Sequence, residues 1–507
     1  MVFNLQCAVL RADEIHAVDE RAAQMGVPPF QLMQQAANAL ANAILQRYPL
    51  SKVLVVCGPG NNGGDGFGLA KLLAQRGWSV HICTEEGALP HSSPAKEHAQ
   101  RWVGSIKAFE QISAAQLEQF DLIIDAGFGI GLSRVLNPTW QSFLQRLQHS
   151  QKPIIAIDVP TGLGATGTSY AAHPITATLT LALFKKKLVH ILSPGRAFCG
   201  EVVVCDIGLE PAHLPSPPVF FENQPKLWWP YWQQTRPDGH SHKYRRGQVM
   251  VFGGPQLPGA PCLSALGAAV AGAGLVSILT DPQTWPIYAA QMQAVMVRRF
   301  TNKLVFKEKI SAANCHALVL GPGALGVADL VDYLGAVLAT HKPCVLDAEA
   351  LNILAQTDDC WSALHANCVL TPHEGEFKRL FPQAAKLLES NRVQAVQQAA
   401  QQARCVVVLK GAETLIALDS GEVAINNHAG PYLATAGSGD VLAGVIAAFL
   451  AQGVPPFFAA AMAVWLHGEA GYLAGVGLTA DALPHWLVQA QQKLVHNGPN
   501  YAYNDHV

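Results

Sequence analysis

The chain has 507 residues, of which 50% are apolar and 14% are charged, which excludes a disordered chain and predicts two to four packed domains of about 150 residues each. Its 34 Lys and Arg residues and 36 Asp and Glu residues give a formal net charge of −2, so we expect neither a nucleic acid nor an anionic membrane as a partner. Glycine and proline occur at ordinary frequencies, which excludes a collagen-like or linker-rich protein.

The eleven cysteines are scattered and form no C-x-x-C pair. Several of them, including Cys57 and Cys405, lie in apolar runs, which is typical of small buried side chains. This pattern favours a reducing compartment. The N-terminal residues 1–22 carry charges where a signal peptide has an apolar core. We therefore expect a cytoplasmic protein.

The first part of the chain alternates short β-branched runs with helical segments. Strands are expected at residues 52–57, 78–83, 121–125 and 154–158. Continuous apolar strands separated by helices are typical of a parallel sheet that is covered on both faces. This part is therefore expected to be an α/β domain.

A glycine-rich turn follows the first expected strand. Gly58, Gly60 and Gly63 have the spacing G-x-G-x-x-G between a strand and a helix, and Glu85 or Glu86 follows about 20 residues later. Taken alone, the motif indicates either a dinucleotide-binding fold, as in dehydrogenases, or a tight turn without a ligand.

Side chains with oxygen atoms lie at the ends of three of these strands. Asn61, Asn62 and Asp65 fill the glycine-rich turn, and Asp125 and Asp158 end two other strands. Ligands of open parallel sheets bind at the carboxyl ends of the strands, so we expect these side chains to converge. Hard oxygen ligands suit a hard cation, and no Cys/His cluster suggests zinc. A single aspartate at a strand end is more often a helix cap than a ligand, whereas three together favour a ligand site.

The segments GNNGGDG, DAGFGIG and DVPTGL resemble the NAD(P)H-hydrate epimerase family. That family has a Rossmann-like, three-layer αβα fold and interconverts the R and S epimers of hydrated NADH and NADPH (NADHX and NADPHX). The resemblance implies that Asp158 is the acid–base group, because epimerisation at a carbinolamine carbon needs proton transfer. It also implies a potassium ion (K⁺) bound by Asn62, Asp125 and Thr161, where threonine replaces the usual serine and keeps the hydroxyl. The residues that it implies for binding the hydrated nucleotide are Asn61, Asn62, Gly63, Gly64, Asp65, Gly129, Ile130, Gly131, Leu132, Ser133, Arg134, Val135 and Asp158.

A basic run and a proline-rich stretch follow. The run at residues 185–187 consists of three lysines, which we expect on a solvated face. Residues 210–230 contain six prolines, which block regular elements, and Trp228, Trp229 and Trp232 end the stretch. We therefore expect an epimerase domain at residues 1–212, a Pro/Trp-rich linker at residues 213–232 and a second domain at residues 233–495.

The strand pattern restarts after this stretch, at residues 248–252, 317–320, 343–347 and 405–410. Residues 441–466 are almost wholly apolar. They are interrupted at Gln452-Gly453 and Pro455-Pro456, so neither piece approaches the ~20 residues of a membrane-spanning helix. Two buried helices joined by a turn are expected.

The segment TAGSGD at residues 435–440 precedes the first of these helices. Its glycines leave backbone N–H groups of the helix N-terminus facing a phosphate, and Asp440 can take a proton from a substrate hydroxyl. The plainer alternative is an aspartate cap in a glycine-rich turn. Companion loops follow other strands, at residues 320–326, 345–352, 371–376 and 408–414.

The segments GPG, DAEALN, TPHEGEF, LKGAET and AGSGDVLAG together resemble the NAD(P)H-hydrate dehydratase family. That family has a ribokinase-like α/β fold and uses a nucleotide phosphoryl group to activate the hydrate hydroxyl before phosphate is eliminated. The resemblance implies that Asp440 is the base and that ADP with Mg²⁺ is the co-substrate; ADP is favoured over ATP because the two-domain architecture resembles prokaryotic members. The residues that it implies are Ala260, Gly323, His373 and Asp440 for the hydrated substrate, and Lys410, Gly411, Ala412, Glu413, Thr414 and Gly439 for the nucleotide.

The ordered set of motifs predicts a bifunctional isomerase and lyase that repairs hydrated nicotinamide coenzymes. Its expected partners are the small molecules NADHX, NADPHX and ADP or ATP, and a homo-oligomer is expected. Two alternatives stay open. One is a ribokinase-like kinase of a vitamin precursor fused to a Rossmann-like binding domain. The other is a non-enzymatic scaffold, which the presence of Asn62, Asp125, Asp158 and Thr161 disfavours.

Overall fold

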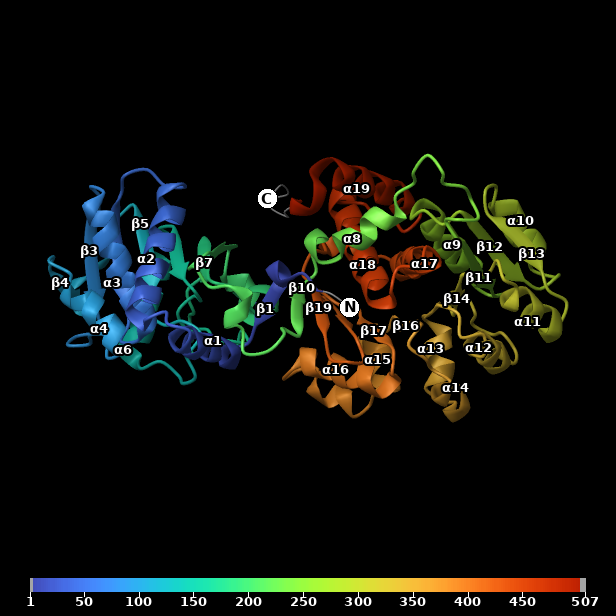
Figure 1. Ribbon diagram of the computed structural model, residues 1–507, viewed down its shortest axis with the longest axis horizontal. Coiled ribbons are helices and arrows are strands. Elements are labelled where there is room, and N and C mark those ends of the chain that lie inside the picture. The colour runs from blue at the N-terminus through green and yellow to red at the C-terminus, as the bar shows by residue number, and fades with distance from the viewer. Residues whose placement is uncertain (1–2, 502–507) are drawn as a thin grey trace. The chain divides into compact units, whose positions relative to one another are not determined.

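The computed structural model describes residues 3–501. They divide into two compact units, one of residues 8–218 and one of residues 3–7 and 219–501 (Figure 1). Each unit has a mainly parallel β-sheet with helices packed against it, as the alternation of β-branched runs and helical segments predicts.

The N-terminal unit is built on a seven-stranded sheet in the order β4-β3-β2-β5-β6-β7-β9, in which every neighbouring pair is parallel. The strands are β2 (Lys52–Cys57), β3 (Ser79–Thr84), β4 (Ile106–Ala108), β5 (Leu122–Ala126), β6 (Ile154–Ile157), β7 (Leu179–Leu183) and β9 (Glu201–Cys205). Two short strands, β1 (Ala8–Leu10) and β8 (Lys186–Lys187), also pair in parallel. The helices are α1 (Ala12–Gln24), α2 (Pro29–Leu45), α3 (Asn61–Gln75), α4 (Ser93–Gln100), α5 (Ala114–Leu117), α6 (Pro138–His149) and α7 (Leu188–Ile191).

Both faces of this sheet are covered by helices. Alternate residues of β2 point to opposite faces, so that Val55 packs in a core with α2 and α3, whereas Leu54 packs in a second core with α6. Figure 1 shows α2 and α3 side by side. The two cores make the unit a three-layer αβα domain of the Rossmann-like kind.

The C-terminal unit contains a larger sheet, in which β13-β12-β11-β14-β15-β16-β17 are parallel neighbours and β18 and β19 follow antiparallel. At its end β10 pairs parallel with β19. The strands are β10 (Phe220–Glu222), β11 (Gln248–Gly253), β12 (Leu275–Thr280), β13 (Met296–Arg299), β14 (Ala317–Leu320), β15 (Cys344–Leu346), β16 (Cys368–Leu370), β17 (Val406–Leu409), β18 (Thr414–Ala417) and β19 (Val423–Asn426).

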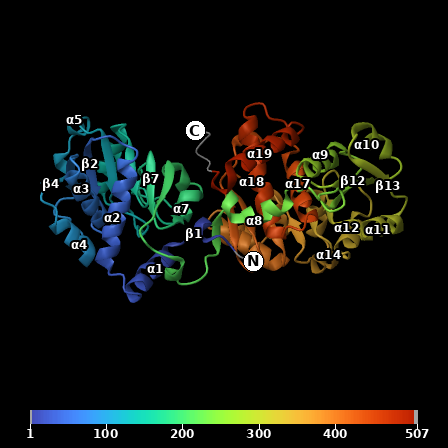
Figure 2. The same ribbon diagram turned by 45° about the horizontal axis from the view of Figure 1, so that its top comes forward.

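The helices of this unit cover its sheet in a ribokinase-like α/β arrangement. They are α8 (Pro225–Thr235), α9 (Gly259–Val270), α10 (Trp285–Gln291), α11 (Lys303–Ser311), α12 (Leu330–Leu338), α13 (Glu349–Leu354), α14 (Asp358–Ser362), α15 (Glu374–Leu380), α16 (Arg392–Ala403), α17 (Ser438–Ala451), α18 (Pro456–Ala474) and α19 (Leu483–Asn497). The apolar stretch expected as two buried helices forms α17 and α18, which pack against each other (Figure 2). Among the described residues, no helix is long and apolar enough to cross a membrane.

The segment expected as a linker differs from that expectation. The boundary between the units falls after Pro218, and the next residues form β10 and α8 of the C-terminal unit. Trp228 and Trp232 are buried, and the Trp228 indole N–H donates to Asn223 Oδ1 at 3.0 Å. Pro225 occupies the first helical turn, where no backbone donor is lost. Pro230 lies inside the helix, and burial of Trp228 and Trp232 outweighs its helix-breaking effect.

The first domain also begins later than residue 1, because residues 3–7 pack with the C-terminal unit. The Phe3 ring stacks on Phe221 of β10, with ring centroids 4.6 Å apart, and contacts Phe457 of α18 edge-on at 5.5 Å. Aromatic pairing across distant parts of the chain gives no periodic sequence signal, so this contact was not foreseen.

Candidate functional site

The glycine-rich turn of the N-terminal unit places Asn62 and Asp65 in the interior. α3 begins directly after the turn that follows β2, and most of its first two turns are buried. Glycine is required here by close contact: a Cβ on Gly58 would lie 1.7 Å from the Gly127 carbonyl oxygen, and a Cβ on Gly63 would lie 1.9 Å from that of Gly58. The G-x-G-x-x-G spacing therefore lets the loops after β2 and β5 close on each other.

Asp125 ends β5, is fully buried and is held by Thr161. Its Oδ1 accepts hydrogen bonds from the Thr161 hydroxyl at 2.6 Å and from Gly127 N at 3.1 Å, and its Oδ2 accepts from Thr161 N at 2.7 Å. Burial raises the pKa of Asp125 to about 6, although these hydrogen bonds lower it. Within residues 3–501 no lysine or arginine forms an ion pair with it. A buried carboxylate without a cationic partner fits a bound cation.

Asn62 lies against the loop after β5. A Cβ on Gly129 would be 3.4 Å from Asn62 Oδ1, and Asn62 Nδ2 is buried with no hydrogen-bond partner among the described residues. Of the three residues expected to hold K⁺, Asp125 and Thr161 are thus in direct contact, and the third borders the same loop. The available oxygen atoms, from a carboxylate, an amide and a hydroxyl, are those a hard cation prefers.

Asp158 follows β6 and forms a buried ion pair with Lys187. The Lys187 ammonium group donates to Asp158 Oδ1 and, at 2.8 Å, to the Leu183 carbonyl. Asp158 has φ = +62°, an uncommon conformation for a non-glycine residue that clusters at functional sites. The expectation that residues 185–187 form a solvated face is therefore wrong for Lys187, whose exposed fraction is 1%.

His190 orients this ion pair. Its Nδ1 accepts from Lys187 N at 3.0 Å, so its Nε2 carries the proton and donates to the Asp158 carbonyl at 2.7 Å. Burial, with the nearby Lys187 charge, lowers the pKa of His190 to about 3, so the ring is neutral. Neither Lys187 nor His190 was foreseen, because a lysine run ordinarily indicates a solvated surface.

Asp65 and Asp158 differ in charge environment. Burial, together with the neighbouring carboxylates of Asp158 and Asp19, raises the pKa of Asp65 well above its usual range. Asp158 by contrast is paired with Lys187. Two carboxyl groups with environments this different are typical of a site for acid–base chemistry.

The remaining residues expected to bind the hydrated nucleotide lie in the loop between β5 and α6. Leu132 is buried, whereas Gly131 and residues 133–135 are exposed. Glu85, considered above as part of a dehydrogenase fingerprint, accepts hydrogen bonds from Asn137 Nδ2 at 2.7 Å and Trp140 Nε1 at 3.1 Å. Its carboxylate anchors the start of α6, which disfavours a role in binding ribose.

In the C-terminal unit, strand-end residues converge on an ion pair between Asp347 and Lys410. Lys410 Nζ lies 2.9 Å from Asp347 Oδ1, and a Cβ on Gly439 would be 3.3 Å from the same nitrogen and 4.0 Å from Asp347 Oδ2. Burial lowers the pKa of Lys410, but the adjacent Asp347 carboxylate outweighs it and raises the pKa above the usual range. Lys410 is therefore a fixed positive charge beside the N-terminus of α17.

Asp440 lies in the first turn of α17, in the field of this ion pair. Burial, then the Asp347 carboxylate, raises the pKa of Asp440 to about 6, and Lys410 partly offsets the shift. Its backbone carbonyl accepts from the Ser264 hydroxyl of α9 at 2.8 Å. α9 and α17 touch closely, since a Cβ on Gly444 would lie 1.9 Å from the Ser264 carbonyl oxygen. Asp440 is thus a carboxylate with a pKa near neutrality on a rigid helix.

His373 caps α15 and adjoins Lys410. Its Nδ1 accepts from Gly375 N at 2.9 Å, and Glu376 accepts from His373 N at 2.8 Å, which completes a capping box. Lys410 N donates to the Pro372 carbonyl at 2.9 Å. His373 therefore caps α15 and also lies beside the loop of Lys410.

Gly323 and Ala260 belong to two loops that pack together. Gly323 has φ = +69°, and a Cβ on it would lie 2.6 Å from both the Leu257 carbonyl oxygen and Pro261 Cδ. Ala260 lies between those two residues, at the start of α9. The structure therefore brings together these two residues expected to bind substrate.

Residues 410–413 join the antiparallel strands β17 and β18, and Thr414 begins β18. Gly411 and Ala412 are exposed, whereas Glu413 and Thr414 are buried. Arg392 of α16 donates to the Lys410 carbonyl at 3.4 Å and pairs with Glu374 Oε2 at 3.4 Å.

His467 of α18 is a further residue that the sequence did not single out. Its Nε2 lies 3.0 Å from the Ser438 carbonyl at the start of α17. Burial lowers the pKa of His467 to about 4, so the neutral ring donates this hydrogen bond. The contact fixes the TAGSGD loop. The sequence did not indicate this role, because a histidine in an apolar helical run is most often a core residue.

Comparison with known proteins matches both units. Residues 249–493 match the family described as NAD(P)H-hydrate dehydratase, and residues 29–189 match the family described as YjeF-related protein N-terminus. The bifunctional NAD(P)H-hydrate repair enzyme Nnr of Synechocystis sp. is 31% identical, covering 98% of this chain and 96% of the relative. The enzyme of the same name from Vibrio cholerae is 33% identical, with 92% and 94% covered.

Solved structures that resemble this chain cover about half of it. The ADP/ATP-dependent NAD(P)H-hydrate dehydratase of Bacillus subtilis, co-crystallised with ATP/Mg²⁺, is 27% identical and covers 52% of this chain and 98% of its own, with a TM-score of 0.44. Relatives more than 30% identical extend over more than nine-tenths of this chain and of their own length. The chain therefore belongs to the family of bifunctional NAD(P)H-hydrate repair enzymes.

Proposed function

We propose that the N-terminal unit interconverts the R and S epimers of NADHX and NADPHX and that the C-terminal unit dehydrates the S epimer at the expense of ADP, giving NAD(P)H, AMP and phosphate. The observation that carries the proposal is the position of Asp440, at the start of α17 beside the Asp347–Lys410 ion pair. Family membership over nearly the whole chain supports both activities.

Asp440 is proposed as the base of the dehydratase. The carboxylate takes the proton of the substrate hydroxyl while that oxygen attacks the terminal phosphorus of ADP and AMP leaves. The phosphate ester then departs as the ring nitrogen supplies its lone pair. Loss of a proton from the adjacent ring carbon to the departing phosphate or to solvent water restores the nicotinamide double bond. A pKa of about 6 suits a base that works near neutral pH.

The phosphoryl group is proposed to lie against the N-terminus of α17. Backbone N–H groups at a helix start favour an anion, and Lys410 adds a positive charge beside Gly439. Residues 410–414 and Gly439 are proposed to bind the nucleotide. Ala260, Gly323, His373 and Asp440 are proposed for the hydrated substrate.

Mg²⁺ is proposed to enter with the nucleotide. The neighbourhood of Asp440 fits a hard cation, since the carboxylates of Asp347 and Glu376 act on it. When bound, Mg²⁺ would neutralise phosphate charge. Use of ADP rather than ATP remains a proposal that rests on the two-domain architecture.

In the epimerase, Asp158 is proposed to transfer the proton at the hydrated ring. The Lys187 ammonium holds its carboxylate in place through a buried ion pair, and Asp65, whose pKa burial raises well above its usual range, is proposed as the second carboxyl group of the site. Residues 61–65 and 129–135 are proposed to bind the nucleotide portion.

K⁺ is proposed to bind at Asp125, Thr161 and Asn62, where the buried carboxylate has no cationic partner among the described residues. When bound, K⁺ would supply positive charge for phosphate or ring oxygens. The free state of all eleven cysteines supports a reducing cytoplasm as the proposed location. A homo-oligomer is also proposed.

Purified protein incubated with an R/S mixture of NADHX, ADP and Mg²⁺ tests the function. We expect the near-ultraviolet absorbance of NADH to return completely, because epimerisation feeds the S-specific step. Recovery of the S fraction alone would remove the epimerase assignment, and no recovery with either ADP or ATP would remove the dehydratase assignment.

A vitamin-precursor kinase is the second candidate, because the helix-start loop with Asp440 is common to ribokinase-like kinases. It predicts a stable phosphorylated product when ATP and a vitamin alcohol are supplied. Inorganic phosphate released in proportion to NADH favours the repair activity instead.

A further inference from the structure

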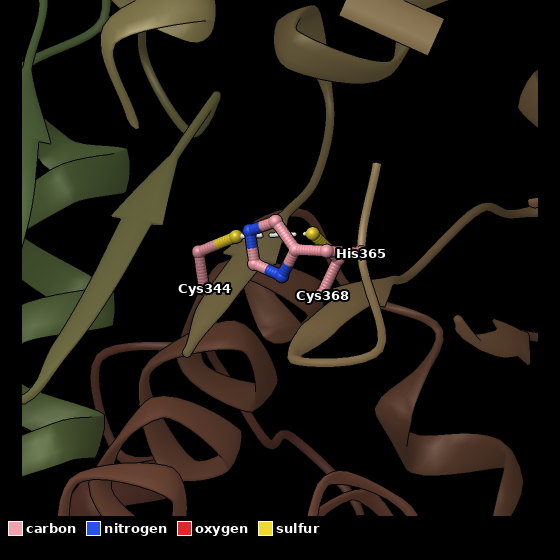
Figure 3. Close-up of side chains that lie close together, drawn as sticks. All are labelled: Cys344, His365 and Cys368. Atoms are coloured by element: carbon pink, nitrogen blue, oxygen red, sulfur yellow. Dashed lines mark hydrogen bonds between the residues drawn. The ribbon is translucent and has the colours of Figure 1, made fainter. Parts of the chain in front are cut away.

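A cluster of two cysteines lies away from both sites, at the beginning of two neighbouring strands. Cys344 starts β15 and Cys368 starts β16, and the two residues are direct partners in the parallel register. Both side chains are buried, and the Cys344 thiol donates to Cys368 Sγ at 3.6 Å (Figure 3). This spacing results from side chains in register pointing to the same face of the sheet.

His365 completes the cluster from the segment before β16. Figure 3 shows its ring beside the two sulfur atoms, and one ligand atom from each of the three residues lies within 4.8 Å of the others. Both ring nitrogens are buried, and the ring interacts with the Cys368 thiol. One buried ring nitrogen can bind a cation together with the two sulfur atoms, which satisfies that polar atom.

We propose that Cys344, His365 and Cys368 bind a thiophilic d¹⁰ cation, with Zn²⁺ as the ion that fits best. Two thiolates and one imidazole are the ligand types zinc prefers. Tetrahedral Zn–S bonds of about 2.3 Å place two sulfurs roughly 3.8 Å apart, close to the 3.6 Å found here. Binding releases the two thiol protons and leaves a site with no net charge.

A further histidine, His341, lies next to the cluster. His341 is exposed, and its ring centroid lies 5.1 Å from that of His365. Either this ring or a water molecule can complete the tetrahedron. The half-buried position of His365 gives the ion a path of entry.

The bound ion has a structural role. β15 and β16 lead from the cluster to Asp347 and to the loop of His373, which follow Cys344 and Cys368 by three and five residues. At about 3.3 Å per residue along a strand, the cluster is roughly 10 Å or more from those groups. The ion therefore contacts no nucleotide or substrate and stabilises the fold by joining two strand starts.

The test uses the full chain, reduced and then stripped of metal with a chelator. Zn²⁺ is titrated against a chromophoric chelator, and Co²⁺ is added separately to detect a thiolate-to-cobalt charge-transfer band. The variants are Cys368→Ser and His365→Gln; Cys315→Ser removes a buried cysteine outside the cluster and is the matched control. Circular dichroism and melting temperature confirm folding. His365→Gln alters a half-buried loop residue, so it remains informative should Cys368→Ser fail to fold.

We expect one tightly bound Zn²⁺ per chain, a Co²⁺–thiolate band and a melting temperature that rises with Zn²⁺. Loss of a ligand should weaken binding by at least about tenfold in His365→Gln and Cys368→Ser, with Cys315→Ser unchanged. The proposal is overturned if the native chain binds no Zn²⁺ after reduction, or if His365→Gln and Cys368→Ser bind it as tightly as Cys315→Ser does.

Discussion

Lys187 and Asp158 form a buried ion pair, although 28 residues separate them in the chain and Lys187 stands in a run of three lysines. The backbone of Asp158 is in the left-handed conformation, and Lys187 supplies the positive charge beside its carboxylate. Removing one member of a buried pair leaves the other charge uncompensated, which costs far more than the loss of a surface pair.

Lys187→Met should therefore lower the rate of epimerisation by about 100-fold or more and reduce the free energy of unfolding by about 3 kcal/mol. The R/S ratio of NADHX is followed by chromatography without nucleotide, so that the dehydratase is silent. Lys96→Met, at an exposed lysine of α4, is the control. Full epimerisation by folded Lys187→Met would contradict the proposed role.

Thr161 tests the potassium site. Thr161→Val preserves the shape of the side chain but removes the hydroxyl that donates to Asp125 at 2.6 Å. We expect the stimulation of epimerisation by K⁺ over Na⁺ to disappear and stability to fall by about 1–3 kcal/mol. Thr161→Ser keeps the hydroxyl and should keep the response to K⁺. An equal response in both variants would place the ion elsewhere.

The pKa of Asp440, about 6, predicts how dehydration depends on pH. The base acts only when ionised, so kcat/KM should be constant above pH 7 and fall about tenfold per pH unit below pH 6. Asp440→Asn should lose dehydration while nucleotide binding, which rests on backbone donors and Lys410, is largely kept. Equal losses of affinity and rate would assign Asp440 a structural or metal-binding role instead.

The same shift predicts an effect on stability. The folded-state pKa is raised from 3.8 to about 6, so this group's favourable contribution is complete below pH 3.8 and is lost as the pH rises through 6. Asp440→Asn cannot ionise and should raise the free energy of unfolding at pH 7.5 by on the order of 1–3 kcal/mol. Denaturant unfolding at pH 7.5 and pH 4 measures this. The gain should vanish at pH 4, and a gain of the same size at both pH values would argue against ionisation as its cause.

His467 is predicted to position the helix-start loop through its hydrogen bond to the Ser438 carbonyl. His467→Leu removes the donor and should lower kcat of dehydration about tenfold with a smaller change in KM. His467→Gln keeps a donor in the same region and should recover part of the rate. Identical rates for the leucine and glutamine variants would show that the hydrogen bond does not matter.

The sequence by itself determined the alternation of strands and helices, because short apolar runs such as residues 52–57 and 317–320 are covered on both faces of a parallel sheet. It also determined the two glycine-rich turns, since Gly58 and Gly63 lie where no Cβ fits. Asp125, Asp158, Asp347 and Asp440 were recognisable because each lies where a strand ends or a helix begins.

Only the tertiary structure decided which distant side chains meet. The run of three lysines predicts a solvated surface, because a local run of charge does not reveal that Lys187 pairs with Asp158. The apolar helix around His467 likewise does not reveal its hydrogen bond to Ser438. The Cys344–His365–Cys368 cluster forms because the register between β15 and β16 places the two cysteines side by side. The sequence shows no C-x-x-C motif that would indicate this cluster. The physical reason is the same in each case: periodicity records burial along one element, whereas pairing of charge and ligands depends on the packing between elements.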